Sequence, residues 1–357
     1  MLRYDRSSNR VGGPRRSLLF VTLAALFGAV SALPSAAQDV TLKLHQMLPP
    51  QAQIPAHFLI PWIEKVETES GGRIKIDHYP AMQLGGKPPM LFDQARDGVV
   101  DITWTVAGYT PGRFPISEVF ELPFMAASAE ATSRAAWDFY QRHLREEYAD
   151  VHVLAIHVHG PGLFHVKGDG IRSLEDMRGK KLRGPTRMIN RLLDTLGATP
   201  VGMPVPAVPE ALSRGVIDGT VIPWEITRPL HITDLVDTHT NFTAKRGLYT
   251  AMFIFSMNKD SYDALAPELQ AVIDANSGLE TSAWAGRVME EGDAPARQIA
   301  VDKGNTIIIL DAAETARWQA AAEAVSDQWI SEMNDRGLDG AALKAEATAL
   351  IDKYAAD

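Results

Sequence analysis

An arginine at the end of a predicted strand is the residue best placed to bind a small anion. Residues 180–183 alternate in the manner of a short strand, and Gly184 ends it. Thr186 can then cap a helix over 187–196. Parallel sheets bind ligands at the carboxyl ends of their strands, and a guanidinium beside a helix N-terminus can hold a carboxylate. Arg183 is therefore a candidate carboxylate-binding residue, with an ordinary ion pair to a surface carboxylate as the alternative.

Aromatic side chains lie near the ends of other predicted strands. Trp104 and Trp224 stand at or just past two strand ends, and Phe164 and His165 follow a break at 160–162. An indole offers a flat apolar face and one N–H donor, so these residues could form the walls of a ligand site. The alternative for both tryptophans is packing in the core, where most tryptophans lie.

The sequence does not predict an enzyme or a cofactor. It contains no G-x-S-x-G, P-loop, G-x-G-x-x-G or H-E-x-x-H pattern. His157 and His159 would share one face of a predicted strand, and His165 follows nearby. No Asp, Glu or Cys completes a metal-binding set at a typical spacing, so we expect no metal site.

The stretch 173–224 positions Arg183 and indicates the fold class. Ser173 and Asp176 form a capping box, and strands and helices then alternate up to Trp224. This alternation favours an α/β fold with a parallel sheet.

The rest of the chain continues this pattern. The segments DGVVD at 97–101 and RGVID at 214–218 each follow a helix and precede a strand, which fits two similar α/β lobes. The Gly/Pro cluster at 160–162 and the strand that starts at Tyr249 are candidate crossovers between the lobes. We expect strands over 40–44, 73–79, 99–106, 151–158, 249–257 and 306–310. We expect helices over 58–70, 88–97, 132–148, 261–275, 279–302 and 340–354, and a long helix at the capping box formed by Asp311 and Glu314.

The first 37 residues have the features of a secretory signal peptide. Arginines precede an apolar run over 18–33, and Ser35, Ala36 and Ala37 offer a cleavage site. Paired arginines at 15 and 16 leave twin-arginine export as an alternative route. Removing this segment, with its five arginines and one aspartate, changes the formal net charge from −9 to −13. We therefore expect an exported periplasmic protein that binds neither nucleic acid nor an anionic membrane surface.

The absence of cysteine excludes disulfides and thiol chemistry.

Four runs of the sequence resemble one known family. The runs are LEDMRGKKLRGPT, LGATPVGMPVPAVPEALSRGVIDG, QLGGKPPMLFDQARDGVVDITWT and EVFELPFM. They resemble the DctP-type solute-binding proteins of tripartite ATP-independent periplasmic (TRAP) transporters. The resemblance covers essentially the whole chain after the signal peptide. It implies a two-lobed periplasmic-binding-protein-like fold, a cleft that closes on ligand, and a long connecting helix. It also implies delivery of the ligand to membrane permease subunits driven by an ion gradient.

The resemblance also implies roles for individual residues. The family's carboxylate-binding arginine corresponds to Arg183. Leu163 stands where the sialic-acid members carry a second arginine, and Ile222 stands where they carry an asparagine. With Met47 and Val205 as further lining, the expected pocket is apolar and flat. It therefore favours an aromatic monocarboxylate over sugar acids and dicarboxylates.

These observations lead to one overall prediction with two alternatives. We expect a periplasmic binding protein for an aromatic monocarboxylate. The alternatives are a binder of aliphatic 2-oxo or hydroxy acids and a protein that presents ligand to a sensor. The predicted parts are a signal peptide at 1–37, lobe I at 38–161 and 249–290, lobe II at 162–248 and 291–330, and a C-terminal helix at 331–357 that packs on the lobes.

Overall fold

The computed structural model describes residues 39–356 of the chain. The predicted signal peptide at 1–37 lies outside the described residues. Among the helices that are described, none is long and apolar enough to cross a membrane.

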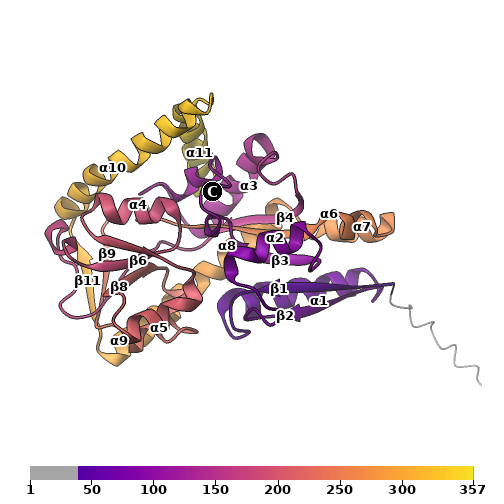
Figure 1. Cartoon of the computed structure of the whole chain (residues 1–357), viewed down its shortest axis with the longest axis horizontal. Coiled ribbons are helices and arrows are strands. Elements are labelled where there is room, and N and C mark those ends of the chain that lie inside the picture. The colour runs from indigo at the N-terminus through magenta and orange to yellow at the C-terminus, as the bar shows by residue number, and fades with distance from the viewer. Residues whose placement is uncertain (1–38, 357) are drawn as a thin grey trace, which may run out of the picture. The chain divides into compact units, whose positions relative to one another are not determined.

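Two β-sheets form the framework of the described chain (Figure 1). The first sheet has the strand order β2-β1-β3-β10-β4, with β1 Val40–Gln46, β2 Ile74–Tyr79, β3 Ile102–Val106, β4 Val151–Val158 and β10 Met252–Asn258. The second sheet has the order β11-β9-β5-β8-β6-β7, with β5 Leu163–Val166, β6 Lys181–Gly184, β7 Thr199–Gly202, β8 Gly219–Ile222, β9 Thr238–Phe242 and β11 Thr306–Leu310.

The expected parallel pairing holds only for part of each sheet. Within the stretch 173–224, β6 is parallel to both β7 and β8, as predicted. In contrast, β5 is antiparallel to β8 and β9, and β10 is antiparallel to β3 and β4. The chain enters β5 and β10 directly from the other sheet through segments that carry no crossover helix. Neither strand is therefore part of a strand–helix–strand unit within its own sheet, the unit that gives parallel pairing, and both sheets are mixed.

Helices cover the faces of both sheets. The helices that follow strands of the first sheet are α1 Ile60–Glu69, α2 Leu91–Arg96, α3 Ala129–Phe139, α6 Lys259–Asp263, α7 Pro267–Ala275 and α8 Leu279–Glu291. The remaining helices are α4 Arg187–Thr195, α5 Val208–Ser213, α9 Asp293–Lys303, α10 Ala312–Asp335 and α11 Gly340–Ala355. The C-terminal helix α11 packs against α3 and α10.

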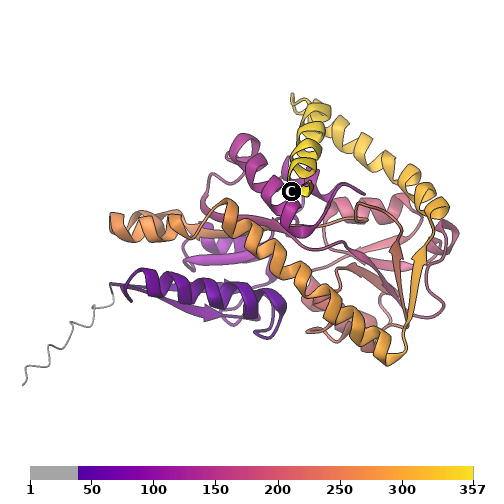
Figure 2. The same ribbon diagram turned by 180° about the vertical axis from the view of Figure 1, so that it is seen from behind.

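The helix pair α8–α9 provides the expected long connection between the sheets. Helix α8 packs against β4, and α9 packs against β11 of the other sheet. Figure 2 shows the pair as one long orange diagonal. The predicted helix over 279–302 is interrupted at Gly292, where a Cβ atom would lie 2.7 Å from Cβ of Glu225. A glycine there lets the connection pass close to the segment that follows β8.

The two similar sequence segments adopt the same turn. Gly98 and Gly215 have φ values of +69° and +67°. Asp101 and Asp218 each accept a 2.7 Å hydrogen bond from a backbone N–H of the neighbouring parallel strand. A positive φ favours glycine, which explains its presence in both segments. The faint sequence repeat therefore corresponds to one local structure used once in each sheet.

Several predicted boundaries differ from the observed ones. The helix expected over 261–275 is divided into α6 and α7, because Pro267 lacks the N–H that a continuous helix would use and starts α7 instead. The strand expected over 99–106 begins at Ile102, after the Gly98 turn. Strand β9 was not predicted. The strands of each sheet fall within the ranges expected for lobe I and lobe II, while the lobe boundaries themselves stay a prediction.

Candidate ligand-binding site

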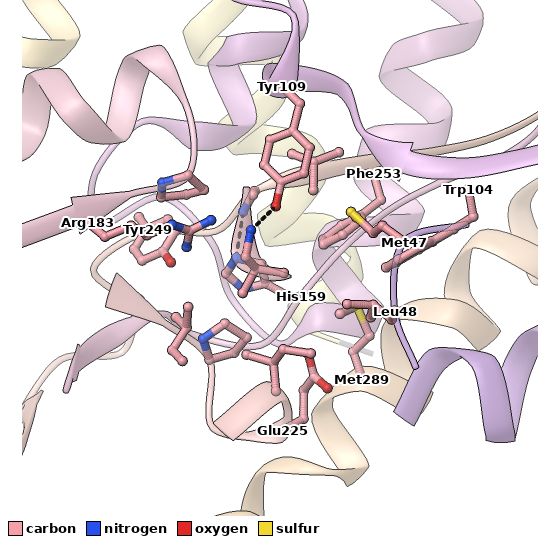
Figure 3. A pocket seen from close by; sticks show the side chains of 17 residues that line it. Met47, Leu48, Trp104, Tyr109, His159, Arg183, Glu225, Tyr249, Phe253 and Met289 are labelled. Atoms are coloured by element: carbon pink, nitrogen blue, oxygen red, sulfur yellow. Dashed lines mark hydrogen bonds between the residues drawn. The ribbon is translucent and has the colours of Figure 1, made fainter. Parts of the chain in front are cut away.

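A pocket lies between segments of both sheets (Figure 3). The residues that line it are Met47, Leu48, Trp104, Val106, Tyr109, His159, Arg183, Pro185, Val205, Ile222, Pro223, Glu225, Ile226, Tyr249, Ala251, Phe253 and Met289.

Arg183 is held in the pocket wall by two backbone carbonyls, one in β8 and one in the residue that follows β7. Its Nε atom donates to the carbonyl of Met203 at 2.8 Å, and Nη1 donates to the carbonyl of Val221 at 3.3 Å. The side chain is 1% exposed, and Nη2 has no hydrogen-bond partner among the described residues. A buried cation with an unused donor is suited to an anionic ligand group.

Two tyrosines lie close to this guanidinium. The hydroxyl oxygen of Tyr109 accepts a 2.9 Å hydrogen bond from the backbone N–H of Val205, so its own proton remains to be donated. Burial raises the pKa of both Tyr109 and Tyr249, while the positive charge of Arg183 opposes this rise. Both side chains are therefore neutral phenols near pH 7. Figure 3 shows them on the same side of the pocket as Arg183.

The other side of the pocket is aromatic and apolar. The rings of Trp104 and Phe253 are stacked with centroids 4.8 Å apart, and His157 stacks on Phe253 at 5.0 Å. The indole N–H of Trp104 donates to Nε2 of His157 at 2.8 Å. Met47 lies beside these rings in Figure 3. This side therefore offers carbon and sulfur surface to a ligand.

His159 is part of the wall, but both ring nitrogens are used by the backbone. Its Nδ1–H donates to the carbonyl of Gly160, and Nε2 accepts from the N–H of Ala251 at 3.0 Å. Burial, together with the positive charge of the nearby Arg183, lowers the pKa of His159 to about 4. The imidazole is therefore neutral and adds no charge to the site.

Glycines in the 160–162 segment allow two side chains to approach the backbone closely. A Cβ atom at Gly162 would lie 2.0 Å from Cε1 of Tyr249, and one at Gly160 would lie 2.3 Å from Oδ2 of Asp293. Only glycine can occupy these positions without moving the tyrosine ring or the carboxylate. The Gly/Pro break seen in the sequence thus shapes the pocket wall directly.

The match to known proteins identifies the family. Residues 48–332 match the family DctP, described as bacterial extracellular solute-binding protein, family 7. The chain belongs to this family. The membership confirms the resemblance to DctP-type TRAP solute-binding proteins, and it identifies the chain as a member of a solute-binding family.

Three solved structures of TRAP solute-binding proteins are similar to this family 7 chain. A protein from Rhodoferax ferrireducens in complex with copurified benzoate is 50% identical, with a TM-score of 0.87, covering 89% of this chain and 99% of that one. A marine-metagenome protein specific for aromatic acid ligands, in complex with metahydroxyphenylacetate, is 53% identical, with a TM-score of 0.87 and coverages of 88% and 99%. A Bordetella bronchiseptica protein with bound (R)- and (S)-mandelate is 30% identical, with a TM-score of 0.82 and coverages of 88% and 99%.

Five of the nine residues that we predicted to bind ligand lie in the pocket wall of this family 7 protein. Arg183 lies on its polar side and Trp104 on its aromatic side. The other three are Met47, Val205 and Ile222.

The structure does not bring the other four residues to the pocket. Leu163 packs with Trp224 and with Ala296 of α9, and His165 contacts Trp224 in an edge-to-face arrangement. Phe164 faces the opposite side of the sheet and packs against Trp318 of α10. Strand β5 is an inner strand of the sheet, so its alternating side chains are covered by helices on both faces.

The three histidines considered for a metal site serve separate structural roles. His157 accepts from Trp104, and His159 is held by the backbone. His165 donates from Nε2 to the carbonyl of Ile222 and shares a 2.6 Å hydrogen bond with His239 through Nδ1. No group of three potential metal ligands occurs within residues 39–356.

Sequence reasoning missed several residues of the wall. Tyr109, Tyr249 and Phe253 come from segments that meet Arg183 only in the folded chain. Glu225 directly follows Trp224, and both residues lie just past the end of β8. The end of this strand predicted a pocket residue at Trp224, whereas the residue that lines the pocket is Glu225. The segment turns there so that Glu225 faces the pocket, while Trp224 packs on His165.

Proposed function

We propose that this chain captures aromatic monocarboxylates in the periplasm and delivers them to the permease subunits of a TRAP transporter. The observation that carries the proposal is the single free guanidinium nitrogen of Arg183 at one side of a pocket whose opposite side is aromatic. The ligand carboxylate would bind Nη2 of Arg183 and the hydroxyl of Tyr109. Its ring would contact Trp104 and Phe253.

The composition of the pocket supports this class of ligand over others. A second carboxylate would need a second cation, and Arg183 is the only Arg or Lys in the described pocket wall. Several hydroxyl groups would need several partners, yet the nitrogens of His159 and the indole N–H of Trp104 are already used. A buried polar group without a partner costs about 1–3 kcal/mol, so dicarboxylates and sugar acids should bind poorly.

The similar solved proteins support the same assignment. The Rhodoferax ferrireducens protein holds benzoate, and the marine-metagenome protein is specific for aromatic acid ligands. Both share about half of their residues with this chain, at 50% and 53% identity. The proposal also includes export through a cleaved signal peptide at 1–37 and partnership with the permease. A binding protein of this family needs both in order to supply a transporter.

A thermal-shift panel tests the ligand class. The panel contains benzoate, phenylacetate and mandelate, with succinate, a sugar acid and an aliphatic 2-oxo acid as comparison classes. Binding at a hundredfold excess over Kd stabilises the folded protein by about 2.7 kcal/mol, which raises the melting temperature measurably. We expect the largest shift with an aromatic acid. A larger shift with succinate or the sugar acid, and none with any aromatic acid, would contradict the proposal.

A further inference from the structure

A buried carboxyl group lies in the pocket wall away from Arg183. Glu225 follows β8 and is 4% exposed. Its Oε2 atom has no hydrogen-bond partner among the described residues. Figure 3 places Glu225 and Arg183 on different sides of the pocket. The carboxylate-binding role of Arg183 therefore leaves Glu225 unexplained.

The surroundings of Glu225 favour its neutral form. Within residues 39–356, no Lys, Arg or His forms an ion pair with it. The carboxyl group of Asp293 lies beside it, since the backbone N–H of Glu225 donates to Oδ1 of Asp293 at 2.8 Å. Burial, together with the negative charge of Asp293, raises the pKa of Glu225 well above its usual range. A buried, unpaired carboxylate would be strongly unfavourable, so the group retains its proton.

A neutral carboxyl group has a specific recognition chemistry. It offers one O–H donor and one carbonyl acceptor, whereas a carboxylate can only accept. A hydroxyl group satisfies both functions because it accepts through its oxygen and donates its proton. A second carboxylate on the ligand would instead face the buried carboxyl group of Glu225 without a compensating cation. The carboxyl of Glu225 therefore matches a neutral hydroxyl on the part of the ligand remote from its carboxylate.

We propose that Glu225 determines specificity by binding a hydroxyl group on the ring, so that the preferred ligands are hydroxylated aromatic monocarboxylates. This inference rests on the proposed function, because it assumes that the carboxylate occupies the Arg183 side of the pocket. It assigns the second polar contact of the ligand to a named residue and distinguishes hydroxybenzoates from benzoate.

Calorimetric titration of the wild-type protein tests the preference directly. The ligands are benzoate and its 2-, 3- and 4-hydroxy derivatives at pH 7. We expect at least one hydroxy isomer to bind tenfold or more tightly than benzoate. Equal affinity for benzoate and all three isomers, within about threefold, would overturn this inference and leave the proposed function intact. Failure of all four to bind would overturn this inference, while the thermal shifts with phenylacetate and mandelate would still decide the proposed function.

Two substitutions then test the residue. Glu225→Gln keeps a donor and an acceptor without a titratable proton, and should retain a preference of at least threefold for the hydroxy isomer. Glu225→Met removes both, and the ratio of the two dissociation constants should fall to near one. The exposed Glu291→Gln is the matched control and should keep the wild-type ratio. A full preference in Glu225→Met would overturn the assignment. If that variant fails to fold, the wild-type titration still decides whether the preference exists.

Discussion

The indole N–H of Trp104 donates a 2.8 Å hydrogen bond to Nε2 of His157. Both residues are fully buried, and Phe253 stacks on both rings. The bond uses the only polar group of the indole, so Trp104 presents apolar surface to the pocket. It also requires that His157 be unprotonated at Nε2, which connects the ligand site to pH.

We predict that protonation of His157 is linked to unfolding at acidic pH. Burial lowers the pKa of His157 to about 3 in the folded protein, below the ordinary value of 6.5. The unfolded chain therefore binds a proton below pH 6.5 that the folded chain excludes, and this stability is lost as the pH falls from 6.5 toward 3. Between pH 6.5 and 5 the loss should be about 1–2 kcal/mol from this group. Urea unfolding at a series of pH values measures it.

The variant His157→Asn tests this linkage. Asparagine retains an acceptor for the indole N–H but does not titrate, so the pH dependence between 6.5 and 5 should become flatter. The exposed His57→Asn serves as the control. An unchanged slope in His157→Asn would show that His157 does not contribute to the acid sensitivity.

We predict that Arg183 carries most of the affinity for the ligand carboxylate. Arg183→Ala should weaken binding by about 2–5 kcal/mol, which exceeds tenfold. Arg183→Lys should not restore binding, because one ammonium group cannot bond the carbonyls of Met203 and Val221 and also present a fixed donor to the ligand. Calorimetry with benzoate measures both effects. The exposed Arg172→Lys should bind normally, and near wild-type affinity in Arg183→Ala would remove Arg183 from the site.

We predict that the hydroxyl of Tyr109 contributes a second hydrogen bond to the carboxylate. Tyr109→Phe should reduce affinity about 10- to 100-fold, corresponding to one hydrogen bond to a charged group. Tyr354→Phe is a matched control, since that hydroxyl donates to Asp138 away from the pocket. Equal affinity of Tyr109→Phe and wild type would indicate that the hydroxyl only accepts from Val205.

We predict that Gly162→Ala disturbs the pocket through the ring of Tyr249. The added Cβ would lie 2.0 Å from Cε1 of that buried ring, and such overpacking costs about 1–3 kcal/mol. Because the clash involves the tyrosine ring, Gly162→Ala should destabilise the folded protein less in a Tyr249→Leu background. Thermal or urea unfolding of the two single variants and the double variant gives the coupling energy. Additive effects would mean that the alanine acts elsewhere.

The sequence was most informative where local signals and function coincide. Arg183 lies at the end of a strand that precedes a capped helix, and the observed β6, the Thr186 cap and α4 follow those signals. Strand β9 could not be predicted because its run THTNF lacks apolar alternation. Its polar residues are satisfied by tertiary partners, as when His239 accepts from Asn305.

The remaining pocket residues depend on long-range geometry. Tyr249 reaches Arg183 because the chain passes back between the sheets, and no local pattern encodes that distance. Glu225 lines the pocket just after β8, and its backbone N–H donates to Asp293, 68 residues away. Such contacts become visible only when the folded segments are placed together.

A crystal structure of the protein with benzoate measures the central claim most directly. We predict electron density for the ligand in the pocket, with a carboxylate oxygen about 2.7–2.9 Å from Nη2 of Arg183 and the ring against Trp104 and Phe253. A benzoate carboxylate bound away from Arg183, or an empty pocket at saturating benzoate, would contradict the account.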